Sequence, residues 1–207
     1  SGQSGTGTLA NGGCIGSNSI NIKTNSLMNN GHSFVITNSS GTTVASSTST
    51  SVSASSLADG VYNVNYTATA KWSIDGNIRD VPWASKVIAT FSFKVDTTAP
   101  TLSGASTSTT GKYVNTTFTV SASDSASGVA ELYWKEPNAT SYSLVSGTSK
   151  TISAGSLNGL YSFYAIDKVS NKSANYYVYY DSVKPTGTIK NSSGTSITSA
   201  YTKDSFS

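Results

Sequence analysis

Four aspartates, Asp96, Asp124, Asp167 and Asp181, are the residues whose type and spacing could hold a cation. Each lies beside a turn signal, and together they could gather near a junction between two units. Ca²⁺ takes six to eight oxygen ligands, usually several of them carboxylates. Yet the whole chain has only 10 Asp and Glu residues. The sequence therefore favours turns in which each Asp accepts hydrogen bonds from its own backbone. No cofactor is expected, and calcium is weighed but disfavoured.

The sequence offers little material for catalysis. Its single histidine, His32, follows an Asn-Gly pair and is expected in an exposed loop. A serine nucleophile would need that histidine beside a carboxylate, and no carboxylate lies near it in sequence. Glu131 and Glu136 lie an odd number of positions apart on one predicted strand, so their side chains point to opposite faces. They cannot act as a glycosidase pair, and the chain is predicted not to be an enzyme.

Trp72, Arg79 and Trp83 form the candidate ligand-binding group. The segment that they bound contains two of the three Trp residues and the only Arg. Trp and Arg are frequent anchors of binding interfaces, and loops at the end of a rigid scaffold often carry recognition. In the alternative interpretation, the two indoles face each other across a hairpin and cover the end of the core or a joint between units. Both interpretations stay open at this point.

The composition indicates a folded, weakly charged, polar exterior. Counting gives 41 Ser and 28 Thr, so 69 of 207 residues carry a small hydroxyl, while charged residues make up 11%. Soluble domains usually have about 25% charged residues. The 12 Tyr, 6 Phe and 3 Trp indicate packed cores. A net charge of +3 gives no basic patch for nucleic acid, no apolar run is long enough for membrane insertion, and Cys14 is the only cysteine.

Strict alternation of apolar and polar residues predicts strands. From Val61 to Trp72 the even positions are apolar and most odd positions are polar, which is the period of a half-buried antiparallel strand. The segment 87–95 alternates in the same way, so the two are predicted to form a long hairpin, with Lys94 facing outward. No segment has helical periodicity. Short strands separated by turn signals predict an all-β fold of β-sandwiches with little or no helix.

Internal repeats divide the chain. Three pairs of segments match: 96–100 with 181–185, 53–62 with 153–161, and 113–119 with 201–207. The offset falls from 99 at the second pair to 85 at the first, so the first copy has 14 extra residues, around 72–83. The predicted domains are 1–96, with a long F-G-type hairpin, 97–184, and 185–207 as the opening strands of a truncated third repeat.

Several motifs carry a family resemblance. They are Leu57-Ala-Asp-Gly-Val-Tyr62, Leu157-Asn-Gly-Leu-Tyr161, Trp134 in Leu-Tyr-Trp-Lys, Ser-Asp-Ser-Ala-Ser-Gly-Val at 123–129, Ala-Ile-Asp-Lys-Val-Ser-Asn at 165–171, and Asp-Ser-Val-Lys-Pro at 181–185. The sequence resembles the tandem immunoglobulin-like repeat domains of Gram-positive-type bacterial surface and adhesin proteins. The resemblance covers 97–207 and the later half of the first unit. Ser170 stands where the family motif has Gly, and the first unit lacks the Asp-x-x-Ser-Gly signature.

The resemblance implies roles for particular residues. Tyr62 and Tyr161 would each enter strand F at a corner where the hydroxyl hydrogen-bonds back to the preceding turn. Trp134 would be a core aromatic on strand C. The pairs Asp96/Pro100 and Asp181/Pro185 would mark the joints, where Pro fixes φ and removes a donor. The implied fold is a tandem array of Ig-like or fibronectin-III-like antiparallel β-sandwiches.

The resemblance also implies an extracellular location, either secreted or attached to the cell wall. The leading hypothesis is a non-enzymatic structural segment or stalk of a bacterial surface protein, with an adhesive role in cell adhesion left open. The alternative is a ligand-binding module that uses Trp72, Arg79 and Trp83, either in an adhesin or appended to a secreted carbohydrate-active enzyme. The expected partners are neighbouring Ig-like repeats and an unidentified host-surface protein or glycan.

Overall fold

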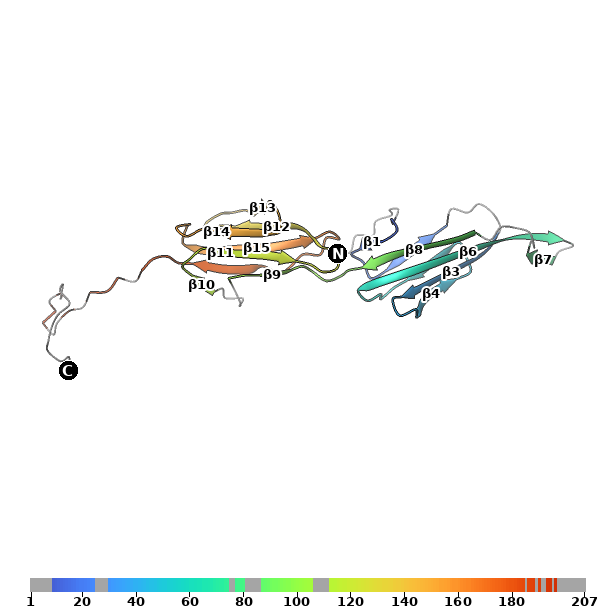
Figure 1. The fold of residues 1–207 in the computed structure, drawn as a ribbon, viewed down its shortest axis with the longest axis horizontal. Helices are drawn as coiled ribbons and strands as arrows, with labels where there is room; N and C mark the ends of the chain where they lie inside the picture. The colour runs from blue at the N-terminus through green and yellow to red at the C-terminus, as the bar shows by residue number, and fades with distance from the viewer. Residues whose placement is uncertain are drawn as a thin grey trace.

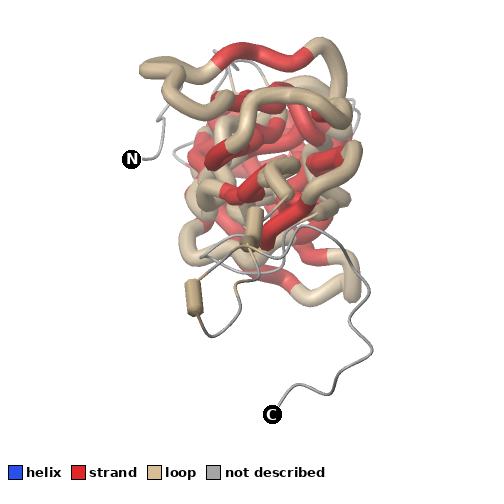
Figure 2. The backbone as a smooth tube through the Cα atoms, turned by 90° about the vertical axis from the view of Figure 1, so that its left-hand side faces the viewer, coloured by secondary structure: helices blue, strands red, loops and turns tan. Residues whose placement is uncertain are grey.

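The computed structural model describes residues 9–24, 30–74, 77–80, 87–105, 112–184, 186–188, 190, 193–194 and 196. All regular secondary structure in this part is β-strand, and Figure 2 shows only strands and loops there. Within the same part, no helix is long and apolar enough to cross a membrane. The all-β prediction is therefore confirmed.

The first unit is the set of sheets formed between residues 13 and 95. Its strands are β1 (Gly13–Ile15), β2 (Ile20–Lys23), β3 (Asn30–Asn38), β4 (Thr43–Ser47), β5 (Ser51–Ala54), β6 (Gly60–Ile74), β7 (Asn77–Asp80) and β8 (Val87–Val95). One sheet has the order β1-β8-β6-β3-β4, with β7 added to the end of β6, and the other is the pair β2-β5. The two sheets pack face to face.

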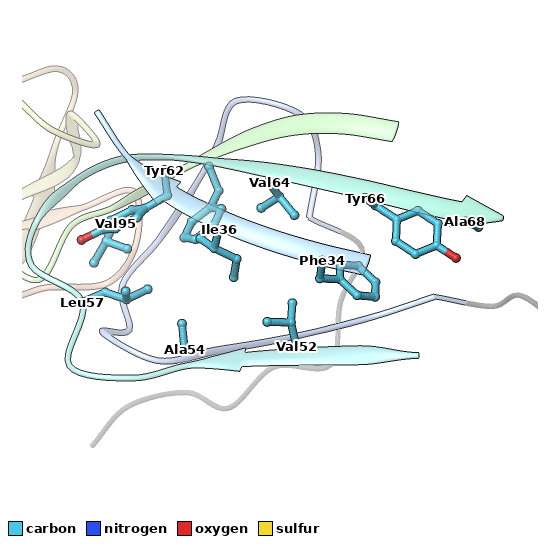
Figure 3. Close-up of a cluster of buried hydrophobic side chains, with 11 residues drawn as sticks. Phe34, Ile36, Val52, Ala54, Leu57, Tyr62, Val64, Tyr66, Ala68 and Val95 are labelled. Carbon is cyan, nitrogen blue, oxygen red and sulfur yellow. The ribbon is translucent and has the colours of Figure 1, made fainter. Parts of the chain in front are cut away.

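The alternation in β6 decides which side chains fill this core. Tyr62, Val64 and Tyr66 are buried, whereas their neighbour Val61 is 44% exposed, as the period of two predicts. Figure 3 shows these side chains meeting Phe34 and Ile36 of β3 above Val52 of β5, so the cluster lies between the two layers.

The predicted long hairpin is present but has an additional strand at its tip. β6 pairs with β8 from Gly60 opposite Val95 to Ala68 opposite Val87. Beyond this ladder β6 continues to Ile74, and β7 folds back on it in antiparallel register. The described part of the extra segment, 72–74 and 77–80, therefore forms an antiparallel strand pair of its own.

The second unit repeats this design between residues 101 and 180. Its strands are β9 (Thr101–Ser103), β10 (Lys112–Val114), β11 (Phe118–Ser123), β12 (Val129–Lys135), β13 (Ser143–Val145), β14 (Ser149–Ile152), β15 (Gly159–Asp167) and β16 (Tyr176–Tyr180). A five-stranded sheet, β10-β16-β15-β12-β13, faces a three-stranded sheet, β14-β11-β9. Phe118, Tyr161 and Phe163 are central to the core between them.

Two strand pairs differ from the purely antiparallel expectation. β1 runs parallel to β8, and β10 runs parallel to β16. In each unit the early strand thus joins the edge of the larger sheet beside the last strand. This pairing of an early strand with the last strand, with the crossed order of the remaining strands, is an Ig-like sandwich arrangement.

The two units lie end to end, and Figure 1 shows β8 leading directly toward the sheets of the second unit. No strand of the described part pairs across from one unit to the other. Of the predicted third repeat, 185–207, most residues lie outside the described part. Its few described residues include an isolated bridge between Lys190 and Ser196.

His32 is not in a loop as the sequence suggested. It lies within β3, half-buried, and its Nδ1 is 2.9 Å from the Tyr66 hydroxyl oxygen. The Asn-Gly pair before it was interpreted as a turn, but β3 already begins at Asn30 and pairs with β6 there. The histidine therefore supports the sheet, and its described polar partner is a tyrosine hydroxyl.

Candidate metal centre at the junction of the two units

Three carboxylates from distant parts of the chain meet at the junction. One oxygen from each of Asp96, Asp124 and Asp167 lies within 4.8 Å of the others. Asp96 follows β8 of the first unit, whereas Asp124 follows β11 and Asp167 ends β15 of the second unit. Asp96 and Asp167 are 0% and 2% exposed. The fourth candidate, Asp181, follows β16 at the other end of the second unit and does not join this group, which we call the acid cluster.

Each carboxylate of the acid cluster also caps its own turn, as the sequence predicted. Asp124 Oδ1 accepts hydrogen bonds from the backbone nitrogens of Ala126 (3.0 Å) and Gly128 (2.7 Å). Asp167 Oδ1 accepts from those of Val169 (2.9 Å) and Asn171 (2.8 Å). Short Asp-led turns of this kind fix the carboxylate direction locally. Turn capping is therefore correct, but it does not by itself bring three carboxylates together.

Hydrogen bonds between the units bring them together. The backbone nitrogen of Ser127 donates to Asp96 Oδ2 at 2.9 Å, and Asn171 Nδ2 donates to the Asp96 carbonyl oxygen at 2.9 Å. Lys94, which faces outward from β8 as predicted, donates from Nζ to the Ala126 carbonyl oxygen at 2.8 Å. Both turns of the second unit are thus bonded to the last residues of the first.

Gly16 allows the backbones of the two units to touch. A Cβ atom placed on Gly16 would lie 2.5 Å from the Val169 carbonyl oxygen and 3.2 Å from the Val169 Cβ. Its backbone is not in the left-handed region, so space alone requires glycine there. Nothing in the local sequence around Gly16 marks this contact, which depends on how the units dock.

The charges of the acid cluster are not balanced by basic residues. Among the described residues, no Lys or Arg side chain forms an ion pair with these carboxylates, and the nearby Lys94 amine binds a carbonyl oxygen instead. Two like charges about 4 Å apart repel by roughly 1 kcal/mol in water and by roughly 4 kcal/mol at the effective dielectric of a protein surface. A bound cation would remove this repulsion.

A second observation at the same place also indicates a ligand. The hydroxyl oxygen of Ser127 is buried and has no hydrogen-bond partner in the described part of the chain, and the backbone nitrogen of the same residue binds Asp96. Buried polar atoms normally have a hydrogen-bond partner, and a bound water or ion is a common reason when the protein supplies none. A metal ion or a metal-bound water beside Ser127 would provide it.

The donor set suits a hard cation. It consists of three carboxylates, which are oxygen ligands of the kind that Ca²⁺ prefers, with water completing the six to eight ligands. Solvent reaches Asp124, because it lines an open cavity of about 290 Å³ together with Thr98, Ala99, Thr101, Ser123 and Ser125. The three carboxylates therefore fit calcium, and the cavity lets solvent reach one of them, Asp124.

Cys14 lies close enough to report the charge of the acid cluster. Burial raises the pKa of its thiol, and the negative charge of Asp96 is the next largest cause. A cation bound there would cancel part of that field, lower the pKa and increase the thiolate fraction. We expect iodoacetamide to alkylate Cys14 about two- to threefold faster at pH 8 with calcium than with chelator, as followed by mass spectrometry. In chelator, Asp96→Asn should be alkylated faster than the wild type, and calcium should not change its rate. A wild-type rate that is the same in both buffers would contradict the expectation.

Ser170, which stands where the motif of the resembled repeats has Gly, has a backbone conformation that lowers the stability of the fold. Its φ is +73°, in the left-handed region that favours glycine, and it lies in the turn capped by Asp167. Left-handed backbone costs a non-glycine residue roughly 1–2 kcal/mol. Glycine avoids this cost, but its greater conformational freedom in the unfolded chain cancels part of the gain in stability. Ser170→Gly should therefore raise the free energy of unfolding by about 0.5–1 kcal/mol in urea denaturation. Ser153→Gly, at an exposed residue without positive φ, should lower it instead.

The candidate ligand-binding group is only partly described. Trp72 in β6 lies directly opposite Arg79 in β7 in the antiparallel register. Trp83 lies outside the described residues. The sequence left open whether Trp72 and Trp83 face each other across a hairpin, and the register places Arg79 opposite Trp72.

The residues named from the family motifs have the following positions. The Tyr62 hydroxyl donates to the Ala58 carbonyl oxygen and the Tyr161 hydroxyl to that of Leu157, both at 2.9 Å. Trp134 is half-buried, and its ring stacks on that of Tyr161 with centroids 6.3 Å apart. Pro100 is buried at the joint, and Pro185 lies outside the described residues.

The strand order and the docked ends define a tandem Ig-like, fibronectin-III-like module. No family model matches the chain, and no curated protein matches it. Among solved structures, it is similar to the fibronectin(III)-like modules of Clostridium thermocellum CbhA, with 19% identity, a TM-score of 0.36, and coverage of 84% of this chain and 90% of that one.

Two further solved structures resemble the chain at 16% identity. The BSP domain of a biofilm associated protein has a TM-score of 0.26, and the match covers 86% of this chain and 30% of that one. SGBP-B of the Bacteroides ovatus mixed-linkage glucan utilization locus, in complex with a mixed-linkage heptasaccharide, has a TM-score of 0.24, and the match covers 87% of this chain and 47% of that one. The chain thus spans less than half the length of these two proteins.

Proposed function

We propose that this chain is a non-enzymatic structural segment of a bacterial extracellular protein, serving as a stalk whose units are fixed end to end. The observation that carries the proposal is the double attachment of Asp96. Its carboxylate accepts a hydrogen bond from Ser127, and its carbonyl accepts one from Asn171, so the end of one unit is bonded to two turns of the next. Such a joint resists bending, which a spacer on a cell surface needs.

We further propose that the acid cluster binds Ca²⁺ and so completes the joint. Asp96 contributes from the first unit, and Asp124 and Asp167 contribute from the second. The ion would supply positive charge between carboxylates that otherwise repel. Because its ligands come from both units, its binding free energy would stabilise their docked arrangement.

Calorimetric melting with calcium and with chelator tests the metal. A ligand at one hundred times its Kd stabilises the folded state by about 2.7 kcal/mol, which for a chain of this size is about 5–10 °C in Tm. Asp124→Asn is the matched variant, because its Oδ1 can still accept from Ala126 and Gly128 while the charge is lost. We expect the calcium response in the wild type and its loss in the variant.

Small-angle scattering of the same samples separates the two parts of the proposal. An extended particle with one fixed maximum dimension supports the stalk. A broad distribution of maximum dimensions in both buffers would contradict the stalk. If the Tm does not respond to calcium while the maximum dimension stays fixed, only the calcium proposal is contradicted.

A second function is favoured by the tip of the first unit. Trp72 and Arg79 lie opposite each other in the β6–β7 hairpin, at the end of the unit away from the junction (Figure 1). A hairpin that carries these residue types at the end of a unit suits a ligand-binding module for a glycan or a host-surface protein. A binding screen against both classes, with Trp72→Ala and Trp83→Ala alongside the wild type, tests it. The absence of wild-type binding above background would contradict this function for the chain.

A further inference from the structure

One outer sheet face of the second unit is aromatic, although the chain is rich in small hydroxyls. Strands β10, β16, β15 and β12, together with the residue before β13, carry outward-facing tyrosines, which we call the tyrosine strip. Its members are Tyr113, Tyr133, Tyr142, Tyr164, Tyr177 and Tyr179. Tyr113 is 70% exposed and Tyr179 38%, and Leu144 and Leu160 on the same face are 59% and 41% exposed. These four are half of the eight large hydrophobic residues exposed in the described part.

The opposite face of the same unit serves as an internal comparison. Strands β14, β11 and β9 present only hydroxyl residues outward, among them Thr119 opposite Thr151 and Ser121 opposite Ser103. The ordinary exterior of this sandwich is therefore Ser and Thr. Exposed apolar area gathered on one face typically marks an interaction site.

The strand registers give the strip its shape. Tyr113, Tyr179 and Leu160 form one row across β10, β16 and β15, and Leu144, Tyr133 and Tyr164 form another across β13, β12 and β15. The rows cross β15 four residues apart. With strands about 4.8 Å apart and about 3.3 Å per residue, the strip spans about 19 Å by 13 Å, or roughly 23 Å along its diagonal.

Lysines accompany the rings. Lys172 Nζ lies 3.9 Å from the centroid of the Tyr164 ring, and Lys135 Nζ lies 5.4 Å from that of Tyr142. The one carboxylate on the face, Glu131, accepts a hydrogen bond from the Tyr133 hydroxyl at 2.9 Å. The face therefore combines aromatic rings with two ammonium groups and one carboxylate, so that its own charge is positive.

The area and the charge of the tyrosine strip together indicate which class of molecule it can bind. The strip covers roughly 250 Å² by these spacings, whereas a stable protein interface buries about 800 Å² on each partner, so a second copy or another folded protein is a poor fit. An extended peptide lying over side chains would find no backbone partners there for its own amides. A sugar polymer brings hydroxyls and C–H faces that suit tyrosine, and acidic groups that suit Lys135 and Lys172.

We propose that the tyrosine strip binds an acidic linear polysaccharide along its diagonal. Tyr113 and Tyr179, whose ring centroids are 4.9 Å apart, form the exposed aromatic end. Lys135 and Lys172 pair with carboxylate or sulfate groups farther along the chain of sugars. This inference is independent of the calcium junction and of the β6–β7 tip.

Affinity electrophoresis tests the proposal with three defined polymers in the gel. Polygalacturonate carries carboxylates, heparin carries sulfates, and dextran is neutral. The wild-type chain should be retarded by at least one acidic polymer and not by dextran, and the comparison of the two acidic gels identifies the preferred group. The double variant Lys135→Gln/Lys172→Gln should weaken binding about tenfold or more, and Tyr113→Ser about threefold.

Lys184→Gln is the matched control, because Lys184 is an exposed lysine of the same unit that lies beyond β16. It should change binding less than twofold. The proposal is overturned by no retardation in either acidic gel, by equal retardation in dextran, or by an equal loss in Lys184→Gln. Self-association in sedimentation experiments that Tyr113→Ser abolishes would also overturn it in favour of a protein partner. Because Tyr113 is 70% exposed, its variant retains the fold, which the urea midpoint verifies.

Discussion

Asp96→Ala is expected to lower the free energy of unfolding by about 2–4 kcal/mol. The substitution removes the acceptor of the Thr98 and Ser127 backbone nitrogens, which lie 3.1 and 2.9 Å from the two carboxylate oxygens. A fully buried donor left without a partner costs about 1–3 kcal/mol, and both of these donors are part-buried. Relief of repulsion from Asp124 and Asp167 offsets part of this loss when no cation is bound. Urea denaturation in chelator measures the net effect.

Asp181→Ala is the natural control, because Asp181 holds the same position at the end of the second unit. Its backbone nitrogen donates to the Val114 carbonyl oxygen at 2.9 Å, as that of Asp96 does to Ile15 at 3.0 Å. Its Oδ1 likewise accepts from the Val183 nitrogen, but the residue is exposed. A loss below about 1 kcal/mol is expected. Equal losses in the two variants would mean that contacts across the junction contribute nothing.

Gly16→Ala is expected to separate the two units without unfolding either one. The new methyl group would overlap the Val169 carbonyl oxygen, which is backbone and cannot rotate away. Overpacking of this kind costs about 1–3 kcal/mol, and here undocking can relieve it. In calorimetry the wild type should unfold with the units coupled, whereas the variant should show two transitions. Small-angle scattering should show a broader range of maximum dimensions.

Gly187→Ala provides the comparison, since a Cβ there would meet no atom within 4 Å and its φ is not positive. Its transitions should match those of the wild type. Unchanged coupling in Gly16→Ala would show that the close approach to Val169 does not hold the units together.

Local patterns predicted the strands because side-chain direction alternates along each one. Tyr62 and Val64 could be placed inside, and Lys94 outside, from sequence position alone. The Asp-led turns were also predictable, since each carboxylate bonds to nitrogens two to four residues away. Both features depend on neighbours in the sequence.

The acid cluster could be suspected but not located from the sequence. Its members are separated by tens of residues, and they meet only because Asn171 and Ser127 dock onto the end of the first unit. Gly16 gave no signal because its neighbour Val169 belongs to the other unit. The tyrosine strip was hidden for a different reason. Tyr133 and Tyr164 suit any strand, and only the register shows that they share an outward face.

The parallel pairing of the early and last strands has a mechanical consequence. β10 and β16 run in the same direction through the second unit and are joined side by side from Lys112 opposite Val178 to Val114 opposite Tyr180, so the chain before β10 and the chain after β16 extend from opposite ends of this pair. A pulling force along the chain would therefore load these hydrogen bonds in shear, all at once, instead of unzipping them one by one. The same geometry in β1 and β8 gives the first unit an equivalent clamp. Each unit would thus resist extension where an early strand lies beside the last strand.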